Sequence, residues 1–140
     1  MLRIRTIGLR EQAAWMKQHL ANFDCRVHGG RMECHGAVRP TPLSREYSVV
    51  ISYESGRRPR VFLPGQQLLR RAADKRIPHT YADDEPCLYY PPALEWRSDM
   101  KISASVVGWL AHWLHYYEIW YATGEWLGGG IDHGINEGTI

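Results

Sequence analysis

The first half of the chain changes from a helical spacing of apolar residues to short extended runs. Leu9, Ala13, Met16 and Leu20 recur at helical spacing, which predicts an amphipathic helix over residues 7–22. Beyond it, β-branched and aromatic runs are separated by glycine and proline turns, a pattern typical of hairpins. We therefore expect an antiparallel sheet of three or four strands, formed by residues 25–28, 32–35, 47–53 and 60–63.

The last third of the chain contains one long predicted helix. Apolar residues recur every three or four positions over residues 102–123, and Gly124 is a natural helix end. Residues 66–75 contain helix formers and are expected to be either a short helical turn or an insertion. From about residue 124 we expect a glycine-rich tail, either flexible or wrapped around a ligand. The predicted core stripe of the helix consists of Val106, Trp109, Leu110, Trp113, Tyr117 and Trp120.

Between the predicted sheet and the long helix lies a stiff polar stretch, residues 77–92. It has prolines at both ends, acidic residues at 83–85, and a cysteine, Cys87, eight residues after His79. The prolines would break a helix, and the acidic residues do not suit a core strand. We therefore predict a loop that presents Cys87.

The composition is that of a single globular domain over residues 1–140. Apolar residues make up 44% and charged residues 23% of the chain. The net charge of +2 argues against nucleic acid as the main partner, although Arg57-Arg58 and Arg70-Arg71 form basic pairs. No apolar run reaches the roughly 18 residues that a membrane span needs, and residues 1–5 do not resemble a signal peptide. We expect a cytoplasmic protein that does not bind a membrane.

Three cysteines without a secretory signal predict reduced thiols, not a disulfide framework. A nucleophilic thiol belongs on a loop near a base, and Cys87 has such a position. The alternative is a buried small hydrophobe next to Leu88, because free cysteine is among the most buried residue types.

His79 is a candidate for a base, an oxyanion donor or a structural brace of the loop. The acidic residues 83–85 are candidates to bind a basic partner or to orient an incoming amine.

The residues Cys25, His28, Cys34 and His35 are of types that suit zinc, but their spacing is not that of a familiar zinc site. In a strand, Cys34 and His35 point to opposite faces, so both cannot easily reach one metal. We expect no metal and no cofactor. Zinc remains an alternative that would require stoichiometric metal in the purified protein.

Other aromatic and histidine residues are ambiguous. The tryptophan stripe of the long helix is expected to pack in the core. Trp126, beside the glycines at 128–130, is expected either to fold back over a neighbouring surface or to bind a peptide. His112 and His115 lie three residues apart on the helix, and we expect them on a solvated or partner-facing surface.

The order of these parts resembles the ubiquitin-conjugating enzyme fold. This α+β fold has an N-terminal helix, a four-stranded antiparallel meander, an active-site cysteine loop and a long helix after it. His79 and Cys87-Leu88 match the family's histidine-led loop with its Cys-Leu pair. Trp96 matches a tryptophan that leads into the helix, and residues 58–62 match a proline-containing segment before the loop. The resemblance covers nearly the whole chain.

A narrower resemblance is to the prokaryotic conjugating-enzyme family of bacterial cyclic-oligonucleotide antiphage signalling systems (CBASS). It implies that Cys87 forms a thioester with the C-terminal carboxyl of a cGAS-like nucleotidyltransferase, which can then pass to a target amine. The residues that carry this resemblance are His79-x-Tyr81-x-Asp83, Cys87-Leu88-Tyr89, Trp96, Trp109, Trp113, Tyr117-Glu118-x-Trp120, Thr123-Gly124-x-Trp126-x-Gly128-Gly129-Gly130 and His133.

The glycine-rich end is the candidate site for the partner's C-terminal tail. Glycine has no side chain to block a narrow peptide, so a peptide can approach closely there. We expect Trp126, Gly128, Gly129, Gly130 and His133 to bind that tail.

The chain departs from the ubiquitin-conjugating pattern after the histidine, where Thr80-Tyr81 replaces Pro-Asn. The asparagine helps to stabilise the loop or the oxyanion, so His79, Tyr81 or backbone N–H groups must replace it. The sequence has no activating domain, which makes a separate activating enzyme a further candidate partner. The rival interpretation is a non-catalytic binding module of the same fold that holds the synthase tail without chemistry.

Overall fold

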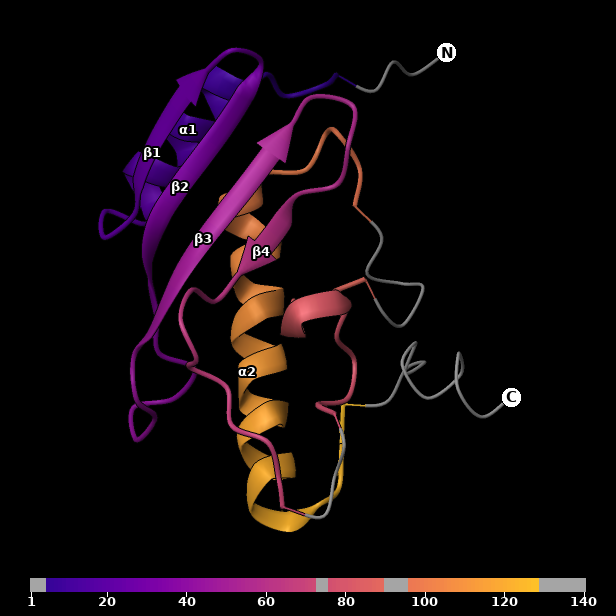
Figure 1. Cartoon of the computed structure of the whole chain (residues 1–140). Coiled ribbons are helices and arrows are strands. Elements are labelled where there is room, and N and C mark those ends of the chain that lie inside the picture. The colour runs from indigo at the N-terminus through magenta and orange to yellow at the C-terminus, as the bar shows by residue number, and fades with distance from the viewer. Residues whose placement is uncertain (1–4, 73–75, 90–95, 129–140) are drawn as a thin grey trace.

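The protein has a four-stranded sheet with both long helices on the same side of it (Figure 1). The computed structural model describes residues 5–72, 76–89 and 96–128. The elements in chain order are α1 (Leu9–His19), β1 (Asp24–His28), β2 (Arg31–Val38), β3 (Tyr47–Glu54), β4 (Arg60–Phe62), the short 3₁₀ helices η1 (Ala82–Asp84) and η3 (Ile102–Ala104), and α2 (Val106–Thr123). None of the helices in this described part is both long and apolar enough to cross a membrane.

The sheet is a simple meander. Its strands pair in chain order, and every pair is antiparallel. Along β3, Tyr47, Val49, Ile51 and Tyr53 are buried, while the residues between them are exposed or half-buried. This period of two directs one face of the sheet into the core. The predicted antiparallel meander is confirmed, with four strands.

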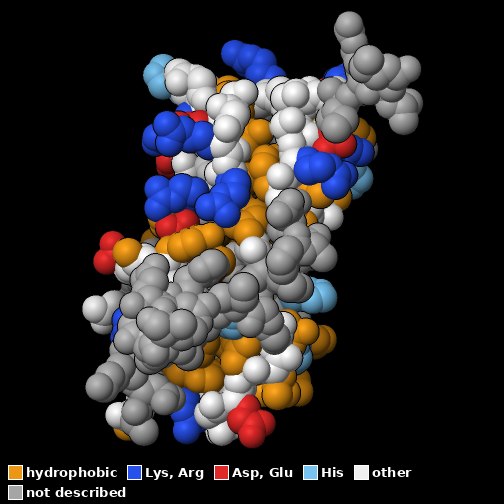
Figure 2. Space-filling view, turned by 90° about the vertical axis from the view of Figure 1, so that its right-hand side faces the viewer, with side chains coloured by type: hydrophobic (Ala, Val, Ile, Leu, Met, Phe, Trp, Pro, Cys, Tyr) orange, Lys and Arg blue, Asp and Glu red, His pale blue; other side chains and the backbone are white. Residues whose placement is uncertain are grey.

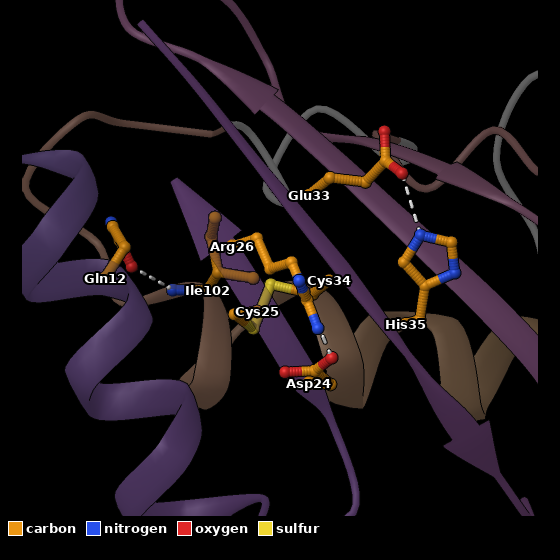
Figure 3. The surroundings of a disulfide bond; sticks show 8 residues. All are labelled: Gln12, Asp24, Cys25, Arg26, Glu33, Cys34, His35 and Ile102. Atoms are coloured by element: carbon orange, nitrogen blue, oxygen red, sulfur yellow. Dashed lines mark hydrogen bonds and ion pairs between the residues drawn. A yellow bond between two sulfur atoms is a disulfide. The ribbon is translucent and has the colours of Figure 1, made fainter. Parts of the chain in front are cut away.

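Helix α1 joins the sheet to the segment that precedes α2. Met16 is fully buried in the core, as its place in the apolar stripe predicts. The fully buried Gln12 donates from Nε2 to the Met100 carbonyl at 2.7 Å and accepts from the Ile102 N–H at 2.9 Å. Figure 3 shows the Gln12 amide directed toward Ile102. One polar side chain therefore satisfies two backbone groups that would otherwise be buried without partners.

Helix α1 ends at His19, and the prediction that it extends to residue 22 is wrong. Leu20 leaves the helical conformation with φ −135° and ψ 71°, and the Phe23 N–H bonds the Leu20 carbonyl at 2.9 Å. This turn brings Phe23 into the core against β2. A Cβ at Gly36 would lie 2.5 Å from the Phe23 ring, so the packing there requires glycine.

Helix α2 forms the opposite part of the core, and the predicted long helix is confirmed. It ends at Gly124, whose φ of 84° gives the left-handed cap that favours glycine. Its tryptophan stripe is largely buried as expected, with Trp109 only partly so, and His112 and His115 are exposed. The buried residues of α2 are Val106, Val107, Leu110, Trp113, Leu114, Tyr117 and Trp120.

Residues 66–72 form an irregular insertion, and no part of this described range is helical. The Tyr117 hydroxyl accepts from the Leu69 N–H at 2.6 Å and donates to the Leu69 carbonyl at 3.2 Å. The Gln67 amide bonds the backbone of Ser48 on β3 in both directions. Side chains of α2 and of the insertion itself thus supply the backbone partners that a helix would otherwise provide.

The prediction of three reduced thiols is wrong, because Cys25 and Cys34 form a disulfide with an S–S distance of 2.17 Å (Figure 3). The β1–β2 register places these two residues directly opposite each other. The sequence did not reveal this pairing, because a shift of the register would separate the two sulfurs. Since both thiols are consumed, the zinc alternative loses its sulfur ligands. The described residues contain no cluster of three or more histidine, cysteine or acidic side chains suited to a metal.

Candidate active site around Cys87

The backbone of residues 79–87 folds back on itself, and this fixes the position of Cys87. The Cys87 N–H bonds the His79 carbonyl at 2.9 Å, and the Tyr81 N–H bonds the Glu85 carbonyl at 2.7 Å. Between these bonds, Thr80 and Pro86 form an antiparallel bridge, and η1 closes the tip of the loop. The predicted loop is therefore a tight hairpin whose two ends are held together directly beside the thiol.

Three non-glycine residues of this hairpin have left-handed backbone conformations. The φ angles are 54° at His79 and 59° at both Asp83 and Asp84. Such conformations are unfavourable for L-residues and persist where surrounding contacts enforce them. Contacts of the hairpin with Arg60, Arg70 and Trp113 supply that restraint.

Two acidic residues of the loop are anchored by arginines from other parts of the chain. Glu85 is buried and pairs with Arg60 of β4 at 2.7 Å. Asp84 pairs with Arg70 of the insertion, also at 2.7 Å. Both carboxylates therefore serve to hold the loop against the sheet and the insertion. Of the three acidic residues that were candidates to face a basic partner, Asp83 is the exposed one.

Helix α2 holds the hairpin from the core side. The buried Trp113 indole donates from Nε1 to the His79 carbonyl at 3.0 Å, the same carbonyl that accepts from the Cys87 N–H. The His79 side chain is only 3% exposed, and its ring centroid lies 5.0 Å from that of Trp126. Among the three roles predicted for His79, this environment favours the structural brace.

The Cys87 side chain is buried, with 0% exposure, and it is the free cysteine of the chain. Leu88 beside it is 2% exposed. A nucleophile needs exposure, and this closed arrangement does not expose the thiol. The sequence left a buried cysteine next to Leu88 open as the alternative, and in the structure Cys87 is buried there.

Tyr81 is the polar side chain in contact with the thiol. Burial raises the pKa of Tyr81 to about 12, a side-chain hydrogen bond with Cys87 adds to the rise, and Arg58 opposes it. Tyr81 therefore stays protonated at neutral pH and can donate a hydrogen bond at the sulfur. Tyr81 occupies the position at which the ubiquitin-conjugating pattern has an asparagine, so its hydroxyl is the group available to replace that side chain.

The β3–β4 turn forms the outer wall of the site, which the sequence did not predict. The Tyr89 hydroxyl donates to the Pro59 carbonyl. The Arg58 guanidinium lies over the Tyr89 ring at 4.9 Å, and the Trp109 ring packs edge-on against the same tyrosine. Burial raises the pKa of Tyr89. In the sequence, Arg58 belonged to a basic pair and to the proline-containing segment 58–62, and neither pattern predicted its contact with Tyr89.

The candidate residues for tail binding fall partly within the described structure. Trp126 folds back onto His79 and Trp113, with ring centroids 5.0 and 5.5 Å away. A Cβ at Gly128 would lie 2.7 Å from the Tyr116 ring, so glycine is needed for this close approach. Trp126 thus covers a neighbouring surface, one of its two predicted fates. The other three candidates, Gly129, Gly130 and His133, lie outside the described residues.

A comparison with protein families identifies the arrangement. The sequence model of the Type II CBASS E2 protein family matches residues 12–134, which include the sheet, the Cys87 hairpin and α2. The chain belongs to this family. Curated proteins yielded no match. The helix–meander–loop–helix order of this CBASS E2 protein is thus that of its family, and the membership places the protein in antiphage defence together with other CBASS components.

Proposed function

We propose that this CBASS E2 protein is a conjugating enzyme that accepts the C-terminal carboxyl of a cGAS-like nucleotidyltransferase as a thioester on Cys87. The observation that supports it most is the position of the free thiol. Cys87 stands at the base of a hairpin held by Trp113 and Arg60, with the Tyr81 hydroxyl at its sulfur. A loop fixed on both sides holds a nucleophile in one attack geometry.

The chemistry begins with an activated acyl group, either an acyl adenylate or an acyl thioester, supplied by a separate activating enzyme. The Cys87 thiol gives its proton to solvent, and the thiolate attacks the carbonyl carbon. A C–S bond forms as the bond to the leaving AMP or thiol breaks. A target amine then attacks the same carbon, the sulfur leaves with its bonding electrons as the Cys87 thiolate, and the nitrogen gives its extra proton to solvent. The thioester splits one difficult acyl transfer into two easier steps.

The Tyr81 hydroxyl is the proposed hydrogen-bond donor to the oxyanion in both steps. Its raised pKa, about 12, keeps the proton on the phenol over the working pH range. His79, whose ring is buried against Trp126, contributes by holding the backbone on which Cys87 is pinned. The thiol has to become exposed before it reacts, and the proposed opening step is a rotation of the Tyr81 side chain that uncovers the sulfur and keeps the hydroxyl beside it.

Intact-mass analysis of the protein co-expressed with a candidate nucleotidyltransferase and an activating enzyme tests the proposal. The wild type should give an adduct that reductant removes, and Cys87→Ser should give an ester that reductant does not remove. Cys87→Ala should give no adduct, and circular dichroism should show that it is folded. A covalent adduct that survives in Cys87→Ala would contradict the proposal.

The second candidate function is a binding module that holds the nucleotidyltransferase tail without chemistry. The complete burial of Cys87 is the observation that favours it. The rate of alkylation by a maleimide separates the two functions, because the Cys25–Cys34 disulfide leaves Cys87 as the one thiol to label. An enzyme should open and be alkylated in the native state in the absence of its partners. A binding module should be alkylated only after unfolding.

A further inference from the structure

A cavity of about 630 Å³ lies between the outer side of β3–β4 and the Cys87 hairpin. Its volume is within the range of pockets that bind small ligands or short peptide segments. Tyr81, which bonds the Cys87 thiol, and Tyr89 lie in its wall. The cavity therefore opens beside the candidate nucleophile, and we call it the arginine pocket after the four arginines that line it: Arg31, Arg57, Arg58 and Arg60.

Positive charge in the arginine pocket is only partly neutralised. Arg31 and Arg57 share the carboxylate of Glu54, at 2.7 and 3.4 Å. Arg60 is occupied by the buried Glu85 at 2.7 Å. Three of the four arginines thus meet two carboxylates in ion pairs. The third acidic residue of the wall, Asp83, forms no ion pair with the described residues.

Arg58 is the arginine of this pocket without a carboxylate partner among the described residues. Its guanidinium is exposed and lies over the Tyr89 ring at 4.9 Å, and it also acts on Tyr81. Stacking on an aromatic ring fixes the plane of a guanidinium and leaves its N–H groups available to an anion. Arg58 therefore stands beside Tyr89 and Tyr81 as a positioned cation whose N–H groups can donate to a carboxylate.

We propose that the arginine pocket binds an acidic segment of the protein that delivers the carboxyl group to Cys87, and that Arg58 selects this segment. The inference rests on the proposed function for the identity of the bound protein. A carboxylate matches the fork of a guanidinium, whereas the protonated amine of an acceptor lysine would be repelled by the same charges. The donor, not the acceptor, is therefore the protein that fits.

Among the described residues, the wall of the arginine pocket lacks one feature that is common in phosphate sites. Phosphate sites commonly use the backbone N–H groups at the start of an α-helix. Helix α1 begins at Leu9 and α2 at Val106, and neither residue lines this pocket. The surface pairs of Arg31 and Arg57 with Glu54 are weak, since both arginines are largely exposed, so incoming carboxylates can exchange with them. In the view of Figure 2, most of the visible lysine and arginine side chains lie in the upper half, with acidic side chains among them.

Peptide binding to the full-length Cys87→Ala protein tests this inference. The variant cannot form a thioester, so the result does not depend on whether the proposed chemistry occurs. The probe is a short peptide of alternating glycine and glutamate with a free C-terminus, and the matched control peptide has glutamine in place of glutamate. The glutamate peptide should shift the amide resonances of residues 57–62 and 81–89. Added salt should weaken this binding, because the contacts are exposed charges.

Arg58→Glu should lower the affinity for the glutamate peptide about tenfold or more, because it replaces an attraction by a repulsion. Arg58→Gln removes the charge and keeps a long polar side chain, and it replaces Arg58→Glu in the test if that variant fails to fold. It should lower the affinity for the glutamate peptide severalfold. Arg45→Glu is the matched control. Arg45 also lies over a tyrosine ring, at 4.7 Å from that of Tyr47, but outside the pocket. Its change should leave the affinity within about twofold.

Three results would overturn the inference. The first is that the glutamine peptide binds as tightly as the glutamate peptide. The second is that Arg45→Glu lowers the affinity as much as Arg58→Glu does. The third is that inorganic phosphate or a short RNA binds at the same amides more tightly than the glutamate peptide. If the glutamate peptide binds as expected while the wild type forms no adduct with its partners, the proposed acidic-segment site is supported and the proposed conjugating activity is contradicted.

Discussion

At the scale of single residues, the proposed chemistry depends on the contact between Tyr81 and Cys87. The hydroxyl is protonated at neutral pH because burial, and secondly the thiol itself, raises its pKa to about 12. A donor held at the reacting sulfur is also close to the oxyanion that would form on the carbonyl next to it. The same contact covers the thiol in the closed state, so one side chain would both cover and assist Cys87.

Tyr81→Phe tests the assisting role. The substitution removes the hydroxyl and keeps the ring, so the fold and the cover of the thiol should be retained. The rate of thioester formation should fall about a hundredfold, the usual loss when one oxyanion donor is removed. The measurement is the rate at which the reductant-sensitive adduct accumulates. Tyr121→Phe, at an exposed tyrosine near the end of α2, is the control and should react like the wild type. Equal rates in Tyr81→Phe and the wild type would remove Tyr81 from the mechanism.

At the scale of elements, the β1–β2 hairpin is held by a covalent bond in addition to its ladder. Cys34 is fully buried, and Cys25 packs against the core from the edge strand. A hairpin at the edge of a sheet is a part that opens readily, and α1 rests against both of these strands. The disulfide therefore ties the edge strand to the strand beneath it.

Reduction of this disulfide should lower the free energy of unfolding by about 2–3 kcal/mol, the entropy cost of closing a loop of this length in the unfolded chain. Urea unfolding of the oxidised and reduced protein measures it. The Cys87→Ser background removes the third thiol from the comparison. Alkylation in denaturant should add one label to the untreated wild type and three after reduction, since the chain has three cysteines. The same urea midpoint with and without reductant would contradict the prediction.

The elements themselves could be predicted from the sequence because each depends on local spacing. The helical stripe around Met16 and Trp113 and the alternation around Ile51 follow from 3.6- and 2-residue periods. The Cys25–Cys34 pairing depends instead on the register between two strands, which no single strand specifies. The end of α1 at His19 depends on Phe23 reaching the core, a tertiary contact that overrides helix propensity.

The candidate site divides in the same way. The order of parts and the His79–Cys87 spacing predicted the cysteine loop, because the family resemblance contains both. The contact between Arg58 and Tyr89 could not be predicted, because the two residues meet only when the β3–β4 turn folds over the hairpin. The burial of Cys87 was likewise undetermined, since loop position alone does not specify which side chains cover it.

At the scale of the whole molecule, the core contains an unusual number of phenol groups. Tyr47, Tyr53 and Tyr117 lie within the main core, and Tyr81 and Tyr89 pack against it around the Cys87 site. Burial is the first cause of a raised pKa at all five of these tyrosines. At Tyr47 the hydrogen bond to Glu118 of α2, at 2.8 Å, adds to the rise, because a carboxylate opposes a phenolate.

These tyrosines predict that the protein loses stability in alkali. An unfolded tyrosine ionises with a pKa of about 10, whereas the five folded ones hold their protons to higher pH. Their stabilising contribution is thus complete below about pH 10 and declines as the pH rises from there toward the folded pKa values, which for Tyr81 is about 12. The urea midpoint should be constant near neutral pH and fall between about pH 10 and 12.

Absorbance at the phenolate band, followed beside the unfolding signal, should show these tyrosines ionising together with unfolding and not before it. Tyr47→Phe should make the alkaline decline less steep, because one fewer proton is released on unfolding; only the slope with pH is compared, since the variant also loses its bond to Glu118. A midpoint that does not change up to about pH 12, or an unchanged slope in Tyr47→Phe, would show that the buried phenols do not couple the folding of this CBASS E2 protein to pH.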